Sequence, residues 1–170
     1  MTDAHAFIDM HAHPEVMVWL GRGPQDLGDA HNYIRSIEEH FRAEGFGLWA
    51  VERRSDHALI GMNGLRRVLF PDHPMTPCVE IAWRQRRDVW GQGYAIEAAK
   101  AALQDGFNRI ALAEVFAWTA APNVKSQAVM RRLGMERRES LDFEQPGLAE
   151  DNPLRPHLVF STKRTSDRPG

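Results

Sequence analysis

The segment CVEIAWRQRRDVWGQGYAIEAAKAALQDG, residues 78–106, decides the fold class of this 170-residue chain. Its first seven residues alternate between apolar side chains and others, which predicts a β-strand over residues 78–84. Its alanine-rich second half predicts a helix over residues 94–107. Gly91 and Gly93 lie between the two elements, where glycine lets the backbone turn sharply and approach a ligand closely.

The start of the predicted helix offers a binding site for phosphate. The first N–H groups of a helix have no partner within it, and the helix dipole is positive at that end. We therefore expect a phosphate-bearing ligand at residues 91–95. A Rossmann loop would need a glycine in the place of Ile96, and the Gly-Lys-Ser/Thr sequence of a Walker loop is absent from the chain.

Turn residues and hydrophobic periodicity divide the rest of the chain into further elements. Helices are predicted over residues 4–11, 32–44 and 124–133, and strands over 47–53, 58–68, 113–121, 135–143 and 157–160. Loops are predicted over 18–30, 71–77 and 144–156, and the chain is expected to fray from Ser161. We expect one domain of class α/β (α+β) over residues 1–163, with a disordered tail over 164–170.

Composition excludes several classes of protein. The formal net charge is -2 and the sequence pI is about 6.4, so no basic surface for nucleic acid is expected. The first residues lack the basic and apolar regions of a signal peptide, so none is expected, and no apolar run is long enough to predict a membrane span. Cys78 is the single cysteine, which excludes an internal disulfide. A cytoplasmic protein with no nucleic-acid or membrane partner is the expectation.

Two blocks of sequence resemble the GNAT superfamily of acyl-CoA-dependent N-acetyltransferases. Residues 90–95, WGQGYA, are similar to that family's pyrophosphate loop, which reads Gln or Arg, two residues, Gly, one residue, then Gly or Ala. Residues 123–135, NVKSQAVMRRLGM, are similar to the family's later Asn-x-x-Ser/Ala block that ends in Leu-Gly-Phe/Met. The form WGQGYA followed by Glu-Ala resembles the branch that holds the ribosomal-protein N-terminal acetyltransferases.

The resemblance implies a twisted, mostly antiparallel mixed sheet flanked by helices. It also implies acetyl-CoA as cosubstrate and no metal ion. The acetyl group would pass directly, within a ternary complex, to a primary amine on a protein N-terminus or a small molecule. The residues that the resemblance assigns to acetyl-CoA are Ile81, Ala82, Trp83, Trp90, Gly91, Gln92, Gly93, Tyr94, Ala95, Asn123 and Ser126.

Two residues are candidates for proton transfer. In the family a carboxylate at the position of Glu80 often serves as general base, whereas the alternative is a strand glutamate that faces solvent. Many members have a tyrosine where this chain has Met130, and methionine cannot donate a proton. Ser126 is therefore the candidate for protonating the leaving thiolate, and the alternative is a polar residue in a first helical turn.

The acceptor amine stays open at this level. His157 begins the last predicted strand and is a candidate substrate contact, or else it only packs. Acidic residues in and beside the loop over 144–156 could attract an amine, and the alternative is that they only form a solvated loop. These residues are Asp142, Glu144, Glu150 and Asp151. Cys78 could be an acyl-carrying nucleophile, but a buried cysteine is the favoured interpretation.

Departures from the family pattern motivate two further hypotheses. Trp90 stands in place of Gln or Arg and Met130 in place of tyrosine, so a non-catalytic acyl-CoA-binding or sensor domain is an alternative. Family members usually begin with a strand before the first helix, and here Met1 lies almost on that helix. Either the start codon was assigned too late or this strand is absent; in the second case the next strand exposes its edge and could pair with a second copy in a homodimer.

A competing hypothesis comes from the stretch FIDMHAHPEV, residues 7–16. It resembles the opening of metal-dependent amidohydrolases, in which His11 and His13 would bind zinc. That family resembles a TIM barrel, which needs about 250 residues. The alternative is a helix over residues 4–11, followed by a break and a new helical turn that begins at Pro14.

Overall fold

The computed structural model describes residues 3–20 and 27–164. The helices are α1 (Asp3–Ala12), α2 (Pro14–Met17), α3 (Leu27–Glu44), α4 (Tyr94–Asn108) and α5 (Val124–Arg132). The strands are β1 (Leu48–Arg53), β2 (Ala58–Val68), β3 (Cys78–Gln85), β4 (Glu114–Ala120), β5 (Glu136–Arg137), β6 (Phe143–Glu144) and β7 (Pro156–Lys163). Short 3-10 turns are η1 (Val18–Leu20), η2 (Arg87–Val89) and η3 (Glu139–Leu141). Residues 165–170, most of the predicted tail, lie outside the described residues.

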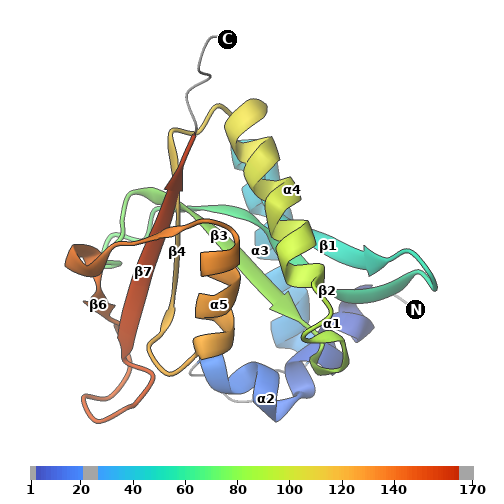
Figure 1. Cartoon of the computed structure of the whole chain (residues 1–170). Coiled ribbons are helices and arrows are strands. Elements are labelled where there is room, and N and C mark those ends of the chain that lie inside the picture. Colours follow the sequence, from blue (N-terminus) through green and yellow to red (C-terminus); the bar gives the residue numbers. More distant parts are fainter. Residues whose placement is uncertain (1–2, 21–26, 165–170) are drawn as a thin grey trace.

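The strands form one seven-stranded sheet of order β1-β2-β3-β4-β7-β5, with β6 also paired to β7 (Figure 1). Only the pairing of β3 with β4 is parallel among the described strands. A parallel pair needs a crossover connection, and α4 provides it. The predicted class, a mixed and mostly antiparallel sheet with helices, is confirmed.

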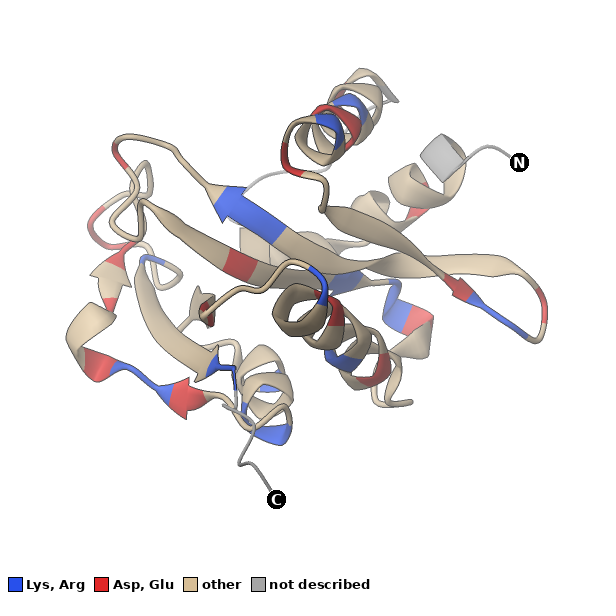
Figure 2. Ribbon diagram, turned by 90° about the horizontal axis from the view of Figure 1, so that it is seen from above, with Lys and Arg blue, Asp and Glu red and all other residues tan. Residues whose placement is uncertain are grey.

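Helices cover both faces of the sheet (Figure 2). Helices α4 and α5 pack on one face over a core that includes Ile81, Val115 and Phe160. Helices α1 and α3 pack on the other face, over a second cluster that includes Phe7 and Met62. Because both faces are covered, the alternating pattern of β3 does not separate a buried face from a solvated one.

Three predicted elements are wrong in extent. The predicted strand over 135–143 is reduced to β5 and β6 around the turn η3, because the Asp142 carboxylate accepts the Val159 N–H at 3.0 Å, which a continuous strand would have used. Strand β7 runs to Lys163, so the chain does not fray from Ser161. Helix α3 begins at Leu27, inside the predicted loop over 18–30, of which residues 21–26 lie outside the described part.

The edge of the sheet at β1 carries features that discourage pairing. Its register with β2 shifts between Val51 and Glu52, and the strand ends in the charged residues Glu52 and Arg53. Irregularities and charges are common ways in which natural sheets blunt an edge. The homodimer expected from an exposed edge stays a prediction.

Helix α1 explains the histidines of FIDMHAHPEV. The His11 ring is fully buried, stacks on Phe7 with 3.8 Å between ring centroids, and has Nδ1 2.6 Å from the Phe7 carbonyl oxygen. Its Nε2 lies against the Arg84 guanidinium, which can only donate, so Nδ1 carries the proton and donates to Phe7. His13 instead accepts from the Glu15 N–H at 3.3 Å and caps α2. Within the described residues no cluster of three or more metal-ligating side chains occurs, so the hydrolase hypothesis is not favoured.

Burial of His11 should make the fold sensitive to acid. Desolvation, followed by the charge of Arg84, lowers its pKa from 6.5 to about 4. The unfolded chain therefore binds this proton at a higher pH than the folded chain does. The free energy of unfolding should fall as the pH drops from about 6.5 to about 4, by on the order of 3 kcal/mol.

Urea unfolding at several pH values between about 7 and about 4 tests this expectation. The His11→Gln variant should lose most of this pH dependence, although it will be less stable at pH 7. The matched control His31→Gln, at an exposed position of α3, should keep the dependence of the wild type. If wild type and His11→Gln lost the same free energy of unfolding between pH 7 and pH 4, the pH dependence could not be assigned to His11.

Candidate functional site

The loop between β3 and α4 has the backbone that an anion site requires. Gly91 and Gly93 have φ of 80° and 91°, which disfavours any residue with a side chain. The Ile96 and Glu97 N–H groups donate to the Gly93 carbonyl at 3.0 and 3.1 Å, so the N–H groups of Tyr94 and Ala95 precede the helical hydrogen bonds. A Cβ built on Gly91 or Gly93 would meet nothing within 4 Å, so the loop is open where a ligand would approach.

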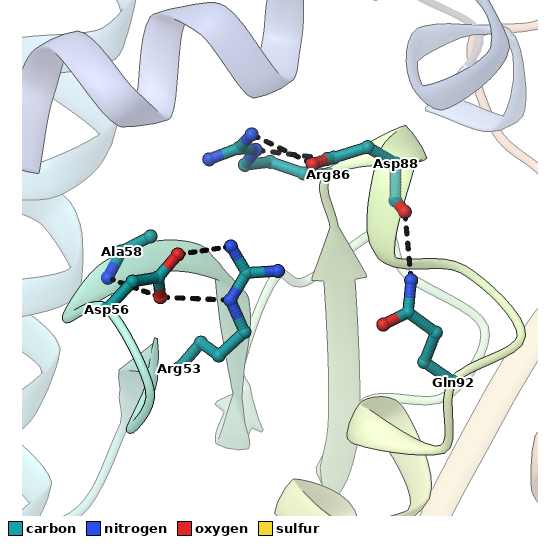
Figure 3. A network of polar contacts seen from close by, with 6 residues as sticks. All are labelled: Arg53, Asp56, Ala58, Arg86, Asp88 and Gln92. Carbon is teal, nitrogen blue, oxygen red and sulfur yellow. Dashed lines mark hydrogen bonds and ion pairs between the residues drawn. The ribbon is translucent and has the colours of Figure 1, made fainter.

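Polar contacts hold the shape of this loop. Asp88 in η2 forms a two-pronged ion pair with Arg86, and its carbonyl accepts from the Gln92 side chain at 3.0 Å (Figure 3). The β1–β2 hairpin lies nearby, where Arg53 pairs with Asp56 (Figure 3). The Gln92 side chain therefore stabilises the loop, and this contact does not use the Gln92 backbone N–H.

The second predicted block lies beside the first one. Asn123 caps α5, its side chain accepting from the Ser126 N–H at 3.2 Å. Trp90 donates from Nε1 to the Gln85 carbonyl at 3.0 Å, and the Lys125 ammonium lies 4.6 Å from the centre of its ring. Arg87 lies over the same ring at 4.9 Å. Trp90 thus connects the glycine loop over residues 90–95 to the first turn of α5, and these contacts give the tryptophan at this position a structural role.

Strand β3 leaves β4 before it reaches this loop. Over the described residues the two strands are registered at a single pair, Glu80 with Phe116, and they diverge toward their C-terminal ends (Figure 1). Ile81 is buried in the main core, and the partly buried Ala82 and Trp83 pack on opposite sides of the sheet. The acetyl-CoA contacts predicted for Ile81, Ala82 and Trp83 would therefore come from their backbone.

Glu80 does not face solvent, so that alternative is wrong. Its side chain is 6% exposed and is paired with the Arg66 guanidinium of β2, which is 35% exposed. Burial raises the pKa of Glu80, and the charge of Arg66 partly opposes this rise. Arg66 was missed at the sequence level because only the β2–β3 register, which places it opposite Glu80, brings the two together.

Other candidate residues have structural explanations. Met130 is 1% exposed within the main core, so the tyrosine position of the family is used for packing in this chain. Ser126 is partly buried in the first turn of α5, beside the capping Asn123. Cys78 is only partly buried, but burial is still the main cause that raises its pKa to about 12, which makes a thiolate nucleophile unfavourable.

The acidic loop is less available to an amine than its composition indicated. The Asp142 carboxylate is held by Arg137 and by the Val159 N–H, and Glu144 pairs with Arg155 at 3.2 Å. His157 stacks on Phe143 with 5.4 Å between ring centroids. It packs against Phe143 on the face of the sheet that also carries Glu80, and its role as a substrate contact stays a prediction.

The sheet diverges after its central parallel pair, and a glycine turn followed by the N-terminus of α4 begins the crossover between the two strands. Residues 1–136 match the family model described as an acetyltransferase (GNAT) domain. The chain belongs to this family and is an acetyl-CoA-dependent acetyltransferase. The alternative of a non-catalytic acyl-CoA-binding domain is not favoured.

Curated and solved relatives agree with this assignment. The chain is 32% identical over 148 residues to the FsC-acetyl coenzyme A-N(2)-transacetylase of Aspergillus fumigatus, covering 81% of this chain and 61% of that protein. It is similar to an acetyltransferase structure from Agrobacterium tumefaciens, with 26% identity, a TM-score of 0.72 and coverage of 95% and 85% of the two chains. A ribosomal-protein-S5-alanine acetyltransferase from Vibrio fischeri shares the fold at 15% identity, with a TM-score of 0.73 and coverage of 98% and 91%. Among the described residues no helix is long and apolar enough to span a membrane.

The glycine loop yields a prediction about acetyl-CoA binding. Gly93→Ala places a methyl group in the open space in front of the loop and disfavours the φ of 91°. We expect the affinity for acetyl-CoA to fall about tenfold or more, which corresponds to about 1.4 kcal/mol. Isothermal titration calorimetry measures this loss directly.

Gly147→Ala is a matched control for the conformational effect. Gly147 has φ of 85°, and a Cβ there also meets nothing within 4 Å, but it lies in the loop between β6 and β7. Both variants should lose a similar stability of about 1 kcal/mol, and only Gly93→Ala should lose affinity. An unchanged affinity of Gly93→Ala for acetyl-CoA would argue against a phosphate site at residues 91–95.

Proposed function

We propose that this protein transfers the acetyl group of acetyl-CoA to a primary amine by direct attack within a ternary complex, with Glu80 as general base. The observation that carries this proposal is a buried carboxylate of raised pKa at the last residue before β3 and β4 separate. A general base works best when its pKa is close to the operating pH. An α-amine has a pKa of about 7.7–8.0 and needs little help, whereas a lysine at about 10.4 needs more.

Each bond change has a candidate group. The amine nitrogen forms a bond to the acetyl carbonyl carbon, and the carbon–sulfur bond breaks. The proton lost from nitrogen goes to Glu80, directly or through water. The thiolate leaves and takes a proton from Ser126 or from solvent. Backbone N–H groups of residues 81–83, beyond the last β4 pairing, are candidates to stabilise the negative charge that develops on the carbonyl oxygen.

The arrangement of the predicted cosubstrate residues supports this proposal. The phosphate loop at residues 90–95 and the start of α5 at Asn123 and Ser126 are brought together by the contact between Trp90 and Lys125. The loop suits the pyrophosphate, and the gap between β3 and β4 lies between the loop and Glu80. Protein N-termini and small-molecule amines both remain acceptor candidates for this chemistry.

The Glu80→Gln variant tests the general base. Glutamine preserves the shape of the side chain and can still accept from Arg66, but it cannot take a proton. We expect kcat/KM for the amine to fall by about 10²- to 10⁴-fold with acetyl-CoA affinity unchanged. A variant that retains most of its activity would remove Glu80 from the mechanism.

Arg66 should set the acidic limb of the pH–rate profile. Its charge lowers the pKa of Glu80 against the larger effect of burial, so Arg66→Gln should raise that pKa further. The base must be deprotonated to act, and the acidic limb of kcat/KM should therefore move to higher pH.

Arg67→Gln is the control for this shift. Arg67 is the next residue of β2, pairs with Glu44 at 2.5 Å and points to the opposite face of the sheet. Its removal also deletes an arginine ion pair but should leave the acidic limb in place. Equal profiles for the two variants would show that the Arg66–Glu80 pair does not govern proton transfer.

A further inference from the structure

Four rings gather on the face of the sheet that carries Glu80. His73, from the loop between β2 and β3, lies 5.1 Å from Trp118 and 5.3 Å from Phe143, measured between ring centroids. Trp118 and Phe143 meet edge to face at 6.1 Å, and His157 stacks on the outer side of this group against Phe143. All four are partly exposed. We call these four residues the ring wall.

Strand register places the ring wall beside the proposed base. Phe116 is the β4 partner of Glu80, and Trp118 lies two residues further along β4, on the same face. Trp118 therefore borders the gap that opens between β3 and β4 beyond Glu80. His157 is opposite Ala120 and Phe143 opposite His157, so the same face continues across β7 and β6.

Three carboxylates around the ring wall form ion pairs with arginines. Glu80 is paired with Arg66, Glu144 with Arg155, and Asp142 with Arg137. Burial is the main cause that lowers the pKa of both His73 and His157, so both imidazoles are neutral at pH 7. The face offers ring surface and neutral nitrogen atoms, with one buried carboxylate at its edge.

Such a surface favours one class of amine. An acceptor with several ammonium groups would find the carboxylates of Glu80, Asp142 and Glu144 already paired with arginines. An acceptor with an aromatic or flat apolar group would instead bury that group against the rings, which contributes both apolar burial and ring–ring contact. Its amine would then reach the gap beside Glu80.

We propose that the ring wall is the acceptor subsite and that it selects a primary monoamine carried on an aromatic or flat apolar group. This inference rests on the proposed function, because it names the acceptor class of the same site. Trp118 supplies the central contact. Phe143 and His157 extend the surface away from Glu80.

Acetyl transfer to matched amines tests the selectivity. The panel contains phenethylamine, butylamine, spermidine and a peptide that begins with alanine, each with saturating acetyl-CoA. We expect kcat/KM for phenethylamine to exceed that for butylamine by about tenfold or more, because the ring adds the contact. Trp118→Leu should bring this ratio close to one. The control Trp49→Leu removes a ring from β1 on the opposite face and should keep the wild-type ratio.

Direct binding separates this inference from the proposed function. Calorimetric titration of phenethylamine into the protein with CoA should show binding that Trp118→Leu and Phe143→Leu lose and Trp49→Leu keeps. That binding pattern supports the subsite even if no amine is acetylated. In that case the proposed function is wrong, and the proposal of an aromatic subsite still stands. The inference is overturned if spermidine or the peptide binds or reacts better than phenethylamine. It is also overturned if both ring variants bind phenethylamine as well as the wild type does. Two separate ring variants keep the test decisive if one of them does not fold.

Discussion

The architecture depends on the early separation of two parallel strands. Strands β3 and β4 are registered at one pair, Glu80 with Phe116, and the crossover through α4 holds them in this arrangement. The crossover brings the N-terminus of α4 to the end of β3, so the glycine loop and the gap lie side by side. Helices on both faces bury the middle of β3, which is why a carboxylate at Glu80 needs a partner such as Arg66.

The strand, loop and helix over residues 78–108 could be predicted from sequence because their determinants are local. Alternation marks β3, alanine favours α4, and two glycines supply the positive φ of the loop. Asn123 likewise caps the helix that follows it. These features need only neighbouring residues, and they also carry the resemblance to the family that the comparisons confirm.

Features that depend on distant segments could not be predicted. Arg66 meets Glu80 through strand register, and the ring wall combines residues from a loop and three strands. The same cause explains the error over residues 135–143, where Asp142 takes a hydrogen bond from β7 and ends the local strand pattern. His11 illustrates the converse, because a spacing typical of metal ligands arises from a buried ring that supports Arg84.

The contacts of Trp90 have a consequence for how the cosubstrate is received. Its indole contacts the Gln85 carbonyl and the side chains of Arg87 and Lys125, so the loop over residues 90–95 and the first turn of α5 are connected by contacts within the protein. At the acetyl-CoA site proposed above, such contacts would reduce the ordering of the chain that binding requires and the conformational entropy lost on association. The affinity of the proposed site would then depend on contacts with the ligand more than on assembly of the loop.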